Sequence, residues 1–358
     1  MMRVDDFLYR YAVRPLLFKL NPEFIHEVIL NSGDFLGRFA LARWLISLLY
    51  GYRGPDISKV VDGIRYERPV LLSAGMDPNG MLTQVLASVS FGGEEVGSTT
   101  AHPCQGNPMP RQTRLIRNNS IIVYKGLRNK GVDVLIEKLK RTRRIPGFVV
   151  GISIALTNYR SESCTSIEGA LDDYALSFKK LNEADIGDYY TLNISCPNTL
   201  GGVEEMLQVP KNFDALLKRI KQIPSTKPLY IKMPINLPWE HFNQLVSVAD
   251  TNGVHGLIIG NLNKNYKDLD YPQDAPEKFR GGLSGKPCFK LSTELLRRTR
   301  EAYGKRFTLI GVGGILTPED AMAKIDAGAD LLMLVTGMIF STPGLMRNIC
   351  YSYAKMKP

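Results

Sequence analysis

The sequence lacks the cysteine patterns that build disulfide frameworks and metal centres. Its five cysteines, an odd number, are scattered from Cys104 to Cys350, and no Cys-x-x-Cys pair occurs. A disulfide framework needs an even set of cysteines, and structural zinc sites need paired ligands. We therefore expect neither kind of site, no bound metal, and a reducing compartment for the chain.

Long uninterrupted apolar runs are also missing. No stretch reaches the roughly 20 apolar residues that a membrane-spanning helix needs. The first residues do not combine a basic start, an apolar core and a small-residue cleavage site, which a signal peptide requires. The sequence predicts neither a transmembrane helix nor a signal peptide.

The charge of the chain is unbalanced: 45 Lys and Arg face 35 Asp and Glu, a net charge of +10. Zinc-finger, recognition-helix and aromatic RNA-binding patterns are absent, so we expect no nucleic-acid partner. A surface attracted to anionic lipid is the other explanation for a basic protein.

Residues 1–53 differ from the rest because large apolar residues recur among Arg and Lys at helical spacing. Asp5-Asp6 is suited to cap a first helix that Pro15 ends or kinks. Asn21-Pro22 is a typical helix start, and a third apolar piece covers 35–49. This pattern predicts an amphipathic helical hairpin in a membrane interface, or a helical lid packed on the main domain, and the two are compatible. We expect a peripheral membrane protein at the cytoplasmic face.

Residues 54–358 have the composition of one globular α/β domain, and short apolar runs alternate in them with stretches of helical spacing. Short apolar runs predict buried strands at 69–73, 94–97, 148–154, 189–194, 229–233, 256–259, 308–312 and 330–335. Helical spacing occurs at 132–144, 166–181, 212–223 and 293–302. Eight strands with intervening helices predict a (β/α)8 TIM barrel. A doubly wound sheet is the alternative, but no Gly-x-Gly-x-x-Gly follows the first strand. The polar segment 261–286 is expected to form a functional loop over the barrel mouth.

Two amides and a thiol follow the predicted strand 189–194. Asn193, Cys196 and Asn198 lie at or just beyond its carboxyl end, and Pro197 is expected to stop the strand. Catalytic groups of such barrels lie at this end. Paired amides suit a planar ligand rich in heteroatoms, and a thiol between them can act as acid or base on a C–H bond. The alternative is a polar turn with an incidental buried cysteine.

Glycines follow the last two predicted strands. Gly311-Val-Gly-Gly314 follows the seventh, and Thr336-Gly337 follows the eighth. Glycine lets backbone N–H groups approach an anion closely, and the loops after strands seven and eight form the usual phosphate site of such barrels. The pair of segments predicts a phosphorylated cofactor.

Four segments carry a resemblance to a known family. They are Gly106-Asn-Pro-Met-Pro-Arg111, Asn193-Ile-Ser-Cys-Pro-Asn-Thr199, Gly281-Gly-Leu-Ser-Gly-Lys-Pro287 and Gly311-Val-Gly-Gly-Ile315. From about Pro15 to the C-terminus the chain resembles dihydroorotate dehydrogenase, and its N-terminal hairpin resembles that of the membrane-associated, quinone-using class 2. The resemblance implies an FMN-containing TIM barrel that oxidises dihydroorotate to orotate in pyrimidine synthesis and passes the electrons to quinone.

The resemblance also implies roles for individual residues. Cys196 occupies the position of the catalytic base, and Lys232 that of a lysine near the flavin ring, where a cation stabilises reduced flavin. The other matched positions are flavin contacts at Ala74, Gly75, Ser98, Ser153 and Asn193; the flavin phosphate at Gly285, Gly313, Gly314, Thr336 and Gly337; the substrate at Asn193, Asn198 and Asn261; and the quinone tunnel at His26 and Arg114.

Several positions depart from the family pattern. Class 2 enzymes have a serine where Cys196 stands, but a thiolate forms more readily than an alkoxide, so cysteine is a competent base. Pro78 replaces a lysine that touches flavin and the substrate carboxylate, and Val123 replaces an asparagine. Losing both donors weakens orotate binding by roughly two to four decades. Lys125 is the candidate substrate-binding cation that restores the charge. Further departures are Ser153 for Asn, Leu262 for Thr, Val335 for Tyr, and Leu200-Gly-Gly-Val203 for Pro-Gly-Leu-Arg.

Three functions remain open from the sequence. The first is a membrane-associated dihydroorotate dehydrogenase with a divergent pocket. The second is a paralogue that binds FMN but acts on another cyclic amide or ene substrate, since Pro78 and Val123 suit a ligand without a carboxylate. The third is a non-catalytic FMN-binding or membrane-scaffold protein, against which Cys196 and Lys232 argue.

Overall fold

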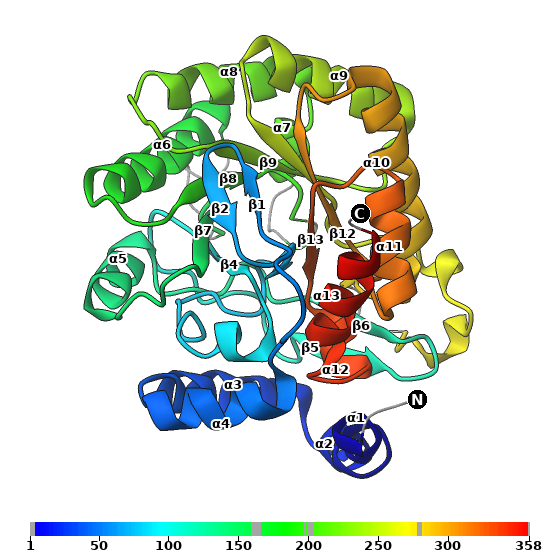
Figure 1. Cartoon of the computed structure of the whole chain (residues 1–358). Coiled ribbons are helices and arrows are strands. Elements are labelled where there is room, and N and C mark those ends of the chain that lie inside the picture. Colours follow the sequence, from blue (N-terminus) through cyan, green and yellow to red (C-terminus); the bar gives the residue numbers. More distant parts are fainter. Residues whose placement is uncertain (1–3, 159–165, 197, 199–202, 278–280, 357–358) are drawn as a thin grey trace.

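Eight parallel strands close into a barrel, as the sequence predicts. The computed structural model describes residues 4–158, 166–196, 198, 203–277 and 281–356 (Figure 1). Around the barrel the strands pair in the order β10 (Gly256–Ile259), β12 (Thr308–Val312), β13 (Leu331–Leu334), β3 (Val70–Leu72), β4 (Gly93–Thr99), β7 (Val149–Ile154), β8 (Tyr189–Asn193) and β9 (Leu229–Met233). Each predicted strand corresponds to one of these.

Helices surround the barrel because each crossover between parallel strands must return over its outer face. They are α5 (Val132–Arg141), α6 (Ile167–Glu183), α7 (Val203–Leu207), α8 (Pro210–Lys221), α9 (Trp239–Thr251), α10 (Phe289–Tyr303), α11 (Pro318–Asp326), α12 (Thr336–Phe340) and α13 (Leu345–Met356). Between β3 and β4 the described chain has a short 3₁₀ turn, Leu86–Val89, where a full helix would complete the repeat. Part of the outer face there is covered by helices from the N-terminus.

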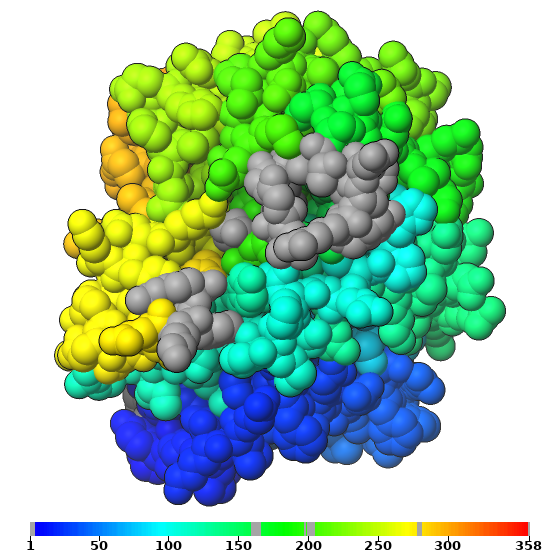
Figure 2. Space-filling model, turned by 180° about the vertical axis from the view of Figure 1, so that it is seen from behind, coloured from blue at the N-terminus to red at the C-terminus, as the bar shows by residue number. Residues whose placement is uncertain are grey.

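Four helical segments precede the barrel and pack across one end of the molecule (Figures 1 and 2). They are α1 (Val4–Leu8), α2 (Arg14–Lys19), α3 (Pro22–Gly37) and α4 (Ala40–Tyr50). Asn21 caps α3 as predicted, because its side chain accepts hydrogen bonds from the backbone N–H groups of Glu23 and Phe24 at 2.8 and 3.2 Å. No helix within the described residues is both long and apolar enough to cross a bilayer. The division into domains 1–53 and 54–358 stays a prediction.

The structure adds two details of this N-terminal part that the sequence pattern left open. The helix does not end at Pro15, because a π-helical turn (Tyr9–Val13) leads into α2, and Arg14 N–H bonds to Tyr9 O just before the proline. Proline lacks the next N–H donor, and the wider turn before it accommodates that loss. The apolar piece 35–49 is not one helix, because α3 ends at Gly37 and α4 starts at Ala40.

Two small antiparallel sheets lie outside the barrel wall. The hairpin of β1 (Lys59–Val61) and β2 (Ile64–Tyr66) brings Tyr66 into an apolar cluster with Tyr189 and Tyr230 of the barrel strands. A three-stranded sheet of β5 (Gln112–Leu115), β6 (Ser120–Val123) and β11 (Gly282–Leu283) lies near the N-terminal helices. The predicted loop 261–286 therefore contains a strand, together with two 3₁₀ turns.

A buried ion-pair cluster fastens the first helix to the last. Arg347 of α13 is 1% exposed and pairs with Asp5 and Asp6 of α1 at 2.8 and 3.1 Å. Asp6 also accepts hydrogen bonds from Thr342 Oγ1 at 2.6 Å and from Asn348 Nδ2 at 3.2 Å. Instead of the predicted helix cap, Asp5 and Asp6 form a contact between the first and the last helix of the described chain.

We expect Asp6→Ala to lower the free energy of unfolding by about 3 kcal/mol, because it leaves the buried Arg347 guanidinium under-compensated. Thermal unfolding and the rate of proteolysis within the first 20 residues measure the effect. Glu137→Ala is the matched control, since its pair with Arg141 is exposed, and we expect it to change stability by less than about 0.5 kcal/mol. Equal effects of the two substitutions would contradict this account.

Candidate active site

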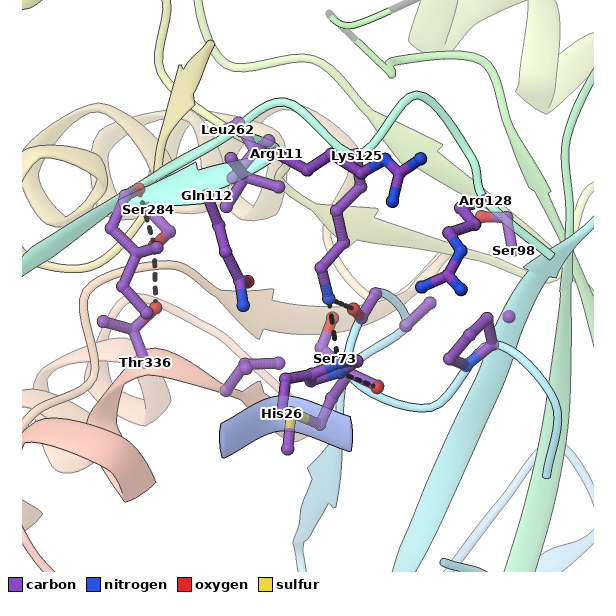
Figure 3. Close-up of a pocket in the computed structure, with 18 of the residues that line it drawn as sticks. His26, Ser73, Ser98, Arg111, Gln112, Lys125, Arg128, Leu262, Ser284 and Thr336 are labelled. Atoms are coloured by element: carbon purple, nitrogen blue, oxygen red, sulfur yellow. Dashed lines mark hydrogen bonds between the residues drawn. The ribbon is translucent and has the colours of Figure 1, made fainter. Parts of the chain in front are cut away.

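A cavity of about 450 Å³ opens at the carboxyl ends of the barrel strands and extends to helix α3 (Figure 3). This volume is in the range of small-molecule sites. Every site residue named from the sequence lines it apart from Ser153. They are Ala74, Gly75, Ser98, Asn193, Cys196, Asn198, Lys232, Asn261, Gly285, Gly313, Gly314, Thr336, Gly337, Lys125, His26 and Arg114.

A chain of hydrogen bonds fixes two of the predicted amides. Asn193 Nδ2 donates to Ser98 Oγ at 2.9 Å, and Asn261 Nδ2 donates to Ser195 Oγ at 2.9 Å and to Asn193 Oδ1 at 3.3 Å. Ser153 is fully buried behind Ser98, with the two hydroxyl oxygens 2.8 Å apart. The amides are thus held in set orientations, and Ser153 reaches the cavity only through Ser98.

Asn198 has a structural role that the sequence did not reveal. Its Nδ2 donates to Val123 O at 2.8 Å, and its Oδ1 accepts from Gly282 N–H at 3.2 Å, so it joins β6 and β11. Asn107 Nδ2 in turn donates to Asn198 O at 2.9 Å. An amide has two donor hydrogens and two acceptor lone pairs, so one of each is left for a ligand.

Cys196 lies in the wall of the cavity just after β8, and it is partly exposed. The strand ends at Asn193, earlier than the predicted stop at Pro197. Pro197, Thr199 and 200–202 lie outside the described residues. The thiol therefore stands at the carboxyl end of a barrel strand, near the two fixed amides, as predicted.

Lys232 of β9 is buried with a carboxylate that the sequence reasoning missed. Lys232 Nζ lies 3.5 Å from Glu95 Oε1 and donates to Ser73 Oγ at 3.1 Å, while Glu95 Oε2 accepts from Thr191 Oγ1 at 2.8 Å. Glu95 is fully buried in β4. An acidic residue inside a predicted buried strand is rare without a partner. The glutamate in the predicted strand 94–97 could therefore have indicated a buried ion pair.

The predicted phosphate end is a turn that only glycine fits. Gly313 and Gly314 have φ of +94° and +76°, and a Cβ on Gly314 would lie 2.5 Å from Phe289 Cβ. Next to this turn, Thr336 Oγ1 donates to Ser284 Oγ at 2.8 Å. Positive φ values at two successive residues are costly for other residues, so the turn requires glycine at both positions, and both line the cavity.

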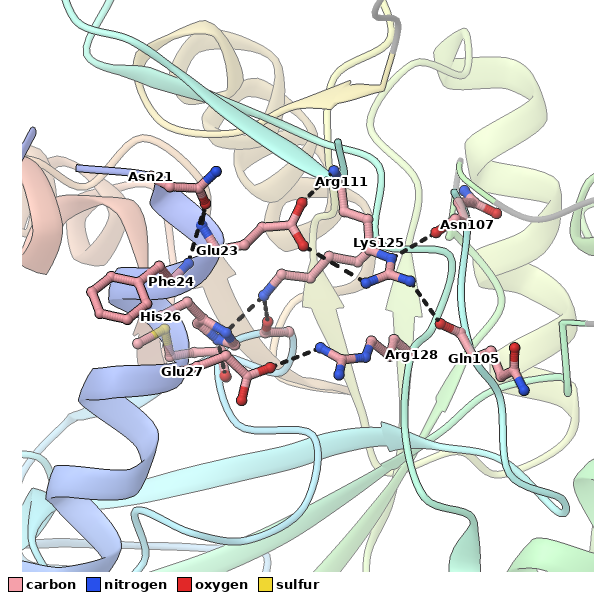
Figure 4. A network of polar contacts seen from close by, with 12 residues as sticks. Asn21, Glu23, Phe24, His26, Glu27, Gln105, Asn107, Arg111, Lys125 and Arg128 are labelled. Carbon is pink, nitrogen blue, oxygen red and sulfur yellow. Dashed lines mark hydrogen bonds and ion pairs between the residues drawn. The ribbon is translucent and has the colours of Figure 1, made fainter. Parts of the chain in front are cut away.

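Helix α3 contributes His26 to the opposite wall (Figures 3 and 4). Its Nε2 lies 2.7 Å from Met76 O and 3.2 Å from Lys125 Nζ, and Lys125 Nζ donates to Gly75 O at 3.1 Å. Burial, with a smaller contribution from Lys125, lowers the pKa of His26 to about 4. Burial lowers the pKa of Lys125 to about 8. At pH 7 this wall therefore carries a neutral imidazole beside an amine that is mostly charged.

Arg114 of β5 fastens α2 beside the cavity. Its guanidinium donates to Leu20 O at 2.9 Å and lies 4.9 Å from the ring centre of Phe18. Burial lowers its pKa, but an arginine keeps its charge in proteins. The residue thus links the helical extension to the cavity wall.

Comparison with known proteins identifies the family to which this chain is similar. A family model described as dihydroorotate dehydrogenase matches residues 57–356. The chain belongs to the dihydroorotate dehydrogenase family. A dihydroorotate dehydrogenase (quinone) of Coxiella burnetii is 35% identical over 350 residues, covering 96% of this chain and 95% of the relative. One of Thermosynechococcus vestitus is 33% identical over 361 residues, covering 97% and 96%.

Solved structures of the dihydroorotate dehydrogenase family share the fold. The Eimeria tenella enzyme in complex with ferulenol superposes with a TM-score of 0.79 over 94% of this chain and 91% of that chain, at 24% identity. Four of the departures from the family pattern lie at the cavity. Pro78, Val123, Leu262 and Val335 all line the cavity.

We expect Glu95→Gln to lower the free energy of unfolding by about 3 kcal/mol, because it leaves the Lys232 ammonium buried without a carboxylate. Denaturant unfolding measures the loss. In the double variant Glu95→Gln with Lys232→Met the charge is gone, and we expect at least half of the stability to return. Additive losses in the double variant would show that the two residues do not act as a pair.

Proposed function

We propose that this protein oxidises dihydroorotate to orotate, with FMN in the barrel cavity and a quinone as the final electron acceptor. The observation that carries the proposal is the convergence of the Cys196 thiol, the fixed amides and the buried Lys232 on one cavity beside a glycine turn. Membership in the dihydroorotate dehydrogenase family supports the same reaction. Pyrimidine biosynthesis is the process that this reaction serves.

The residues present fit FMN. The Gly313-Gly314 turn lines the cavity and packs too closely against Cys288 and Phe289 for any side chain, and glycine turns of this kind suit phosphate. Gly285, Thr336 and Gly337 would complete the phosphate site, and Ala74, Gly75, Ser98 and Lys232 would border the ring. Bound FMN supplies the acceptor for the hydride that leaves the substrate. Lys232 places a positive charge beside that acceptor.

The side chains of the protein carry out the rest of the reaction. Asn193 and Asn261 hold the cyclic amide of the substrate, with the remaining donor and acceptor of Asn198. Cys196 takes the proton from C5 of the substrate, and an oriented general base contributes about 10²- to 10⁴-fold to the rate. Because the amides are already hydrogen-bonded to each other through Ser195, little reorientation is needed.

A second candidate function is the oxidation or reduction of another cyclic amide. Its support is the set of apolar side chains, Pro78, Val123 and Leu262, that line the cavity where the family pattern has polar ones. A ring without a carboxylate suits such a wall. The two candidates predict different results with dihydroorotate.

We expect dihydroorotate to bleach the flavin absorbance near 450 nm in anaerobic stopped-flow, and Cys196→Ala to slow this at least about 100-fold. Cys196→Ser is the conservative comparison, because the hydroxyl retains the position of the base. Flavin that stays oxidised at high dihydroorotate concentration would refute the first candidate and favour the second. Protein that binds no FMN would refute both.

We also propose that helices α1–α4 lie on the cytoplasmic face of a membrane, where quinone is dissolved. Large apolar side chains project from these helices into solvent; they include Phe7, Tyr11, Leu16, Phe35, Leu41 and Trp44. Lys19 and Arg38 are exposed among them. Apolar side chains with flanking cations suit the interface of an anionic bilayer.

We expect Leu41→Glu with Trp44→Glu to reduce co-sedimentation with vesicles of anionic phospholipid by at least about tenfold, because burial of two large apolar side chains is lost. Val134→Glu with Val209→Glu is the matched control, since those apolar side chains are exposed on the barrel side. Equal vesicle binding by the two double variants would contradict the proposed membrane face.

A further inference from the structure

Lys125 is a cation in the cavity wall without a carboxylate partner among the described residues. Its neighbours are already paired across the contact between α3 and the barrel (Figure 4). Arg111 binds Glu23 through its backbone N–H at 2.6 Å, with the guanidinium at 3.7 Å, and Arg128 binds Glu27 at 2.8 Å. The two carboxylates of α3 thus serve two arginines, and neither of them forms an ion pair with Lys125.

When Lys125 is charged, His26 offers it no hydrogen-bond acceptor. His26 Nε2 lies 2.7 Å from Met76 O, which can only accept a hydrogen bond, so this nitrogen carries the proton and donates it. An ammonium can only donate, so it gains no hydrogen bond from the same nitrogen at 3.2 Å. Among the described residues Gly75 O is then the acceptor for a charged Lys125, which has three donor hydrogens.

We propose that Lys125 binds the carboxylate of the substrate and that His26 of helix α3 is a positioning residue, which packs against Lys125 and shields it from water without accepting its hydrogen bond. This inference rests on the proposed function and specifies how its substrate is recognised. Pro78 stands where the family pattern has a lysine for the substrate carboxylate, three residues after Gly75. Lys125 Nζ reaches that same loop from the segment just after β6, so the cation is supplied from a different part of the chain. A carboxylate in the cavity gives the ammonium the acceptor that its present surroundings lack.

The charge of Lys125 makes substrate binding depend on pH. Burial lowers its pKa to about 8, with Arg128 acting in the same direction, while Glu23 and Glu27 of α3 raise it. The loop that packs against it, Gly75-Met76, offers carbonyl oxygens only. Below pH 8 the amine is charged and binds a carboxylate; above pH 8 it is neutral. Affinity for an anionic ligand therefore falls as the pH rises through about 8.

The first test compares two ligands that differ by the carboxylate, orotate and uracil, through their perturbation of bound-flavin absorbance. We expect Lys125→Met to weaken orotate binding about 10- to 100-fold and uracil binding about twofold or less. Lys125→Arg keeps the charge, so its orotate affinity should stay flat between pH 7 and 9 while the affinity of the wild type falls. An unchanged ratio of the two affinities in Lys125→Met would overturn the proposal.

The second test addresses His26. We expect His26→Ala to weaken orotate binding about 3- to 10-fold and to move the alkaline loss of affinity to higher pH, because the side chain that shields Lys125 from water is gone. His26→Gln should restore both, since its amide donates to Met76 O and its side chain again covers Lys125. His241→Ala is the control: His241 Nε2 makes a matching 2.7 Å contact with Gln208 O outside the cavity, and neither property should change. Unchanged affinity and pH dependence in His26→Ala would overturn the positioning role.

The two proposals fail in different ways. If dihydroorotate reduces the flavin of the wild type but Lys125→Met leaves the affinity ratio unchanged, the dehydrogenase function stands and the role of Lys125 is wrong. If wild-type flavin does not respond to dihydroorotate and orotate binds no better than uracil, both are wrong.

Discussion

The register of the closed barrel is the constraint on which the site depends. In parallel pairing Asn193 of β8 is aligned with Lys232 of β9, and Lys232 with Ile258 of β10. Side chains of aligned residues point to the same face of a sheet, so the amide and the ammonium meet at the floor of the cavity. Shifting either strand by one residue would turn its side chain away from the cavity. The loops after the strands then add Cys196 and Asn261 above that floor.

Attachment of the N-terminal helices is partly apolar and partly polar, since α3 buries Ile25 and Leu30 while other contacts are made by charged groups. Helix α4 has no buried residue, and α1 buries only Asp6. The polar contacts that hold these helices are made by charged groups on the barrel side, among them Arg347 with Asp6, Arg114 with Leu20 O, and Arg111 with Glu23. Polar attachment leaves the large apolar side chains of the helices available for another surface.

The barrel could be read from the sequence because most of its strands are short apolar runs buried on both faces, and such runs are a strong local signal; β4, with two glutamates, is the exception. The sheet β5–β6–β11 could not, since β11 has two residues and pairs with β6 across more than 150 positions. The cavity residues carried by the family motifs were found, but Glu95 was missed because its partner Lys232 is 137 positions away. The contact of His26 with Lys125 depends on how α3 docks, and no local pattern encodes that docking.

The position of α3 determines which charges lie near the cavity. If Glu23 and Glu27 were free, they would lie near Lys125 and oppose the entry of an anion. Their pairing with Arg111 and Arg128 cancels that effect, and it does so only when α3 is in place. His26, neutral because it is buried, adds no charge of its own. The same helix that carries exposed apolar side chains therefore also sets the electrostatic potential that the substrate meets, so the N-terminal helices and the substrate site cannot vary independently.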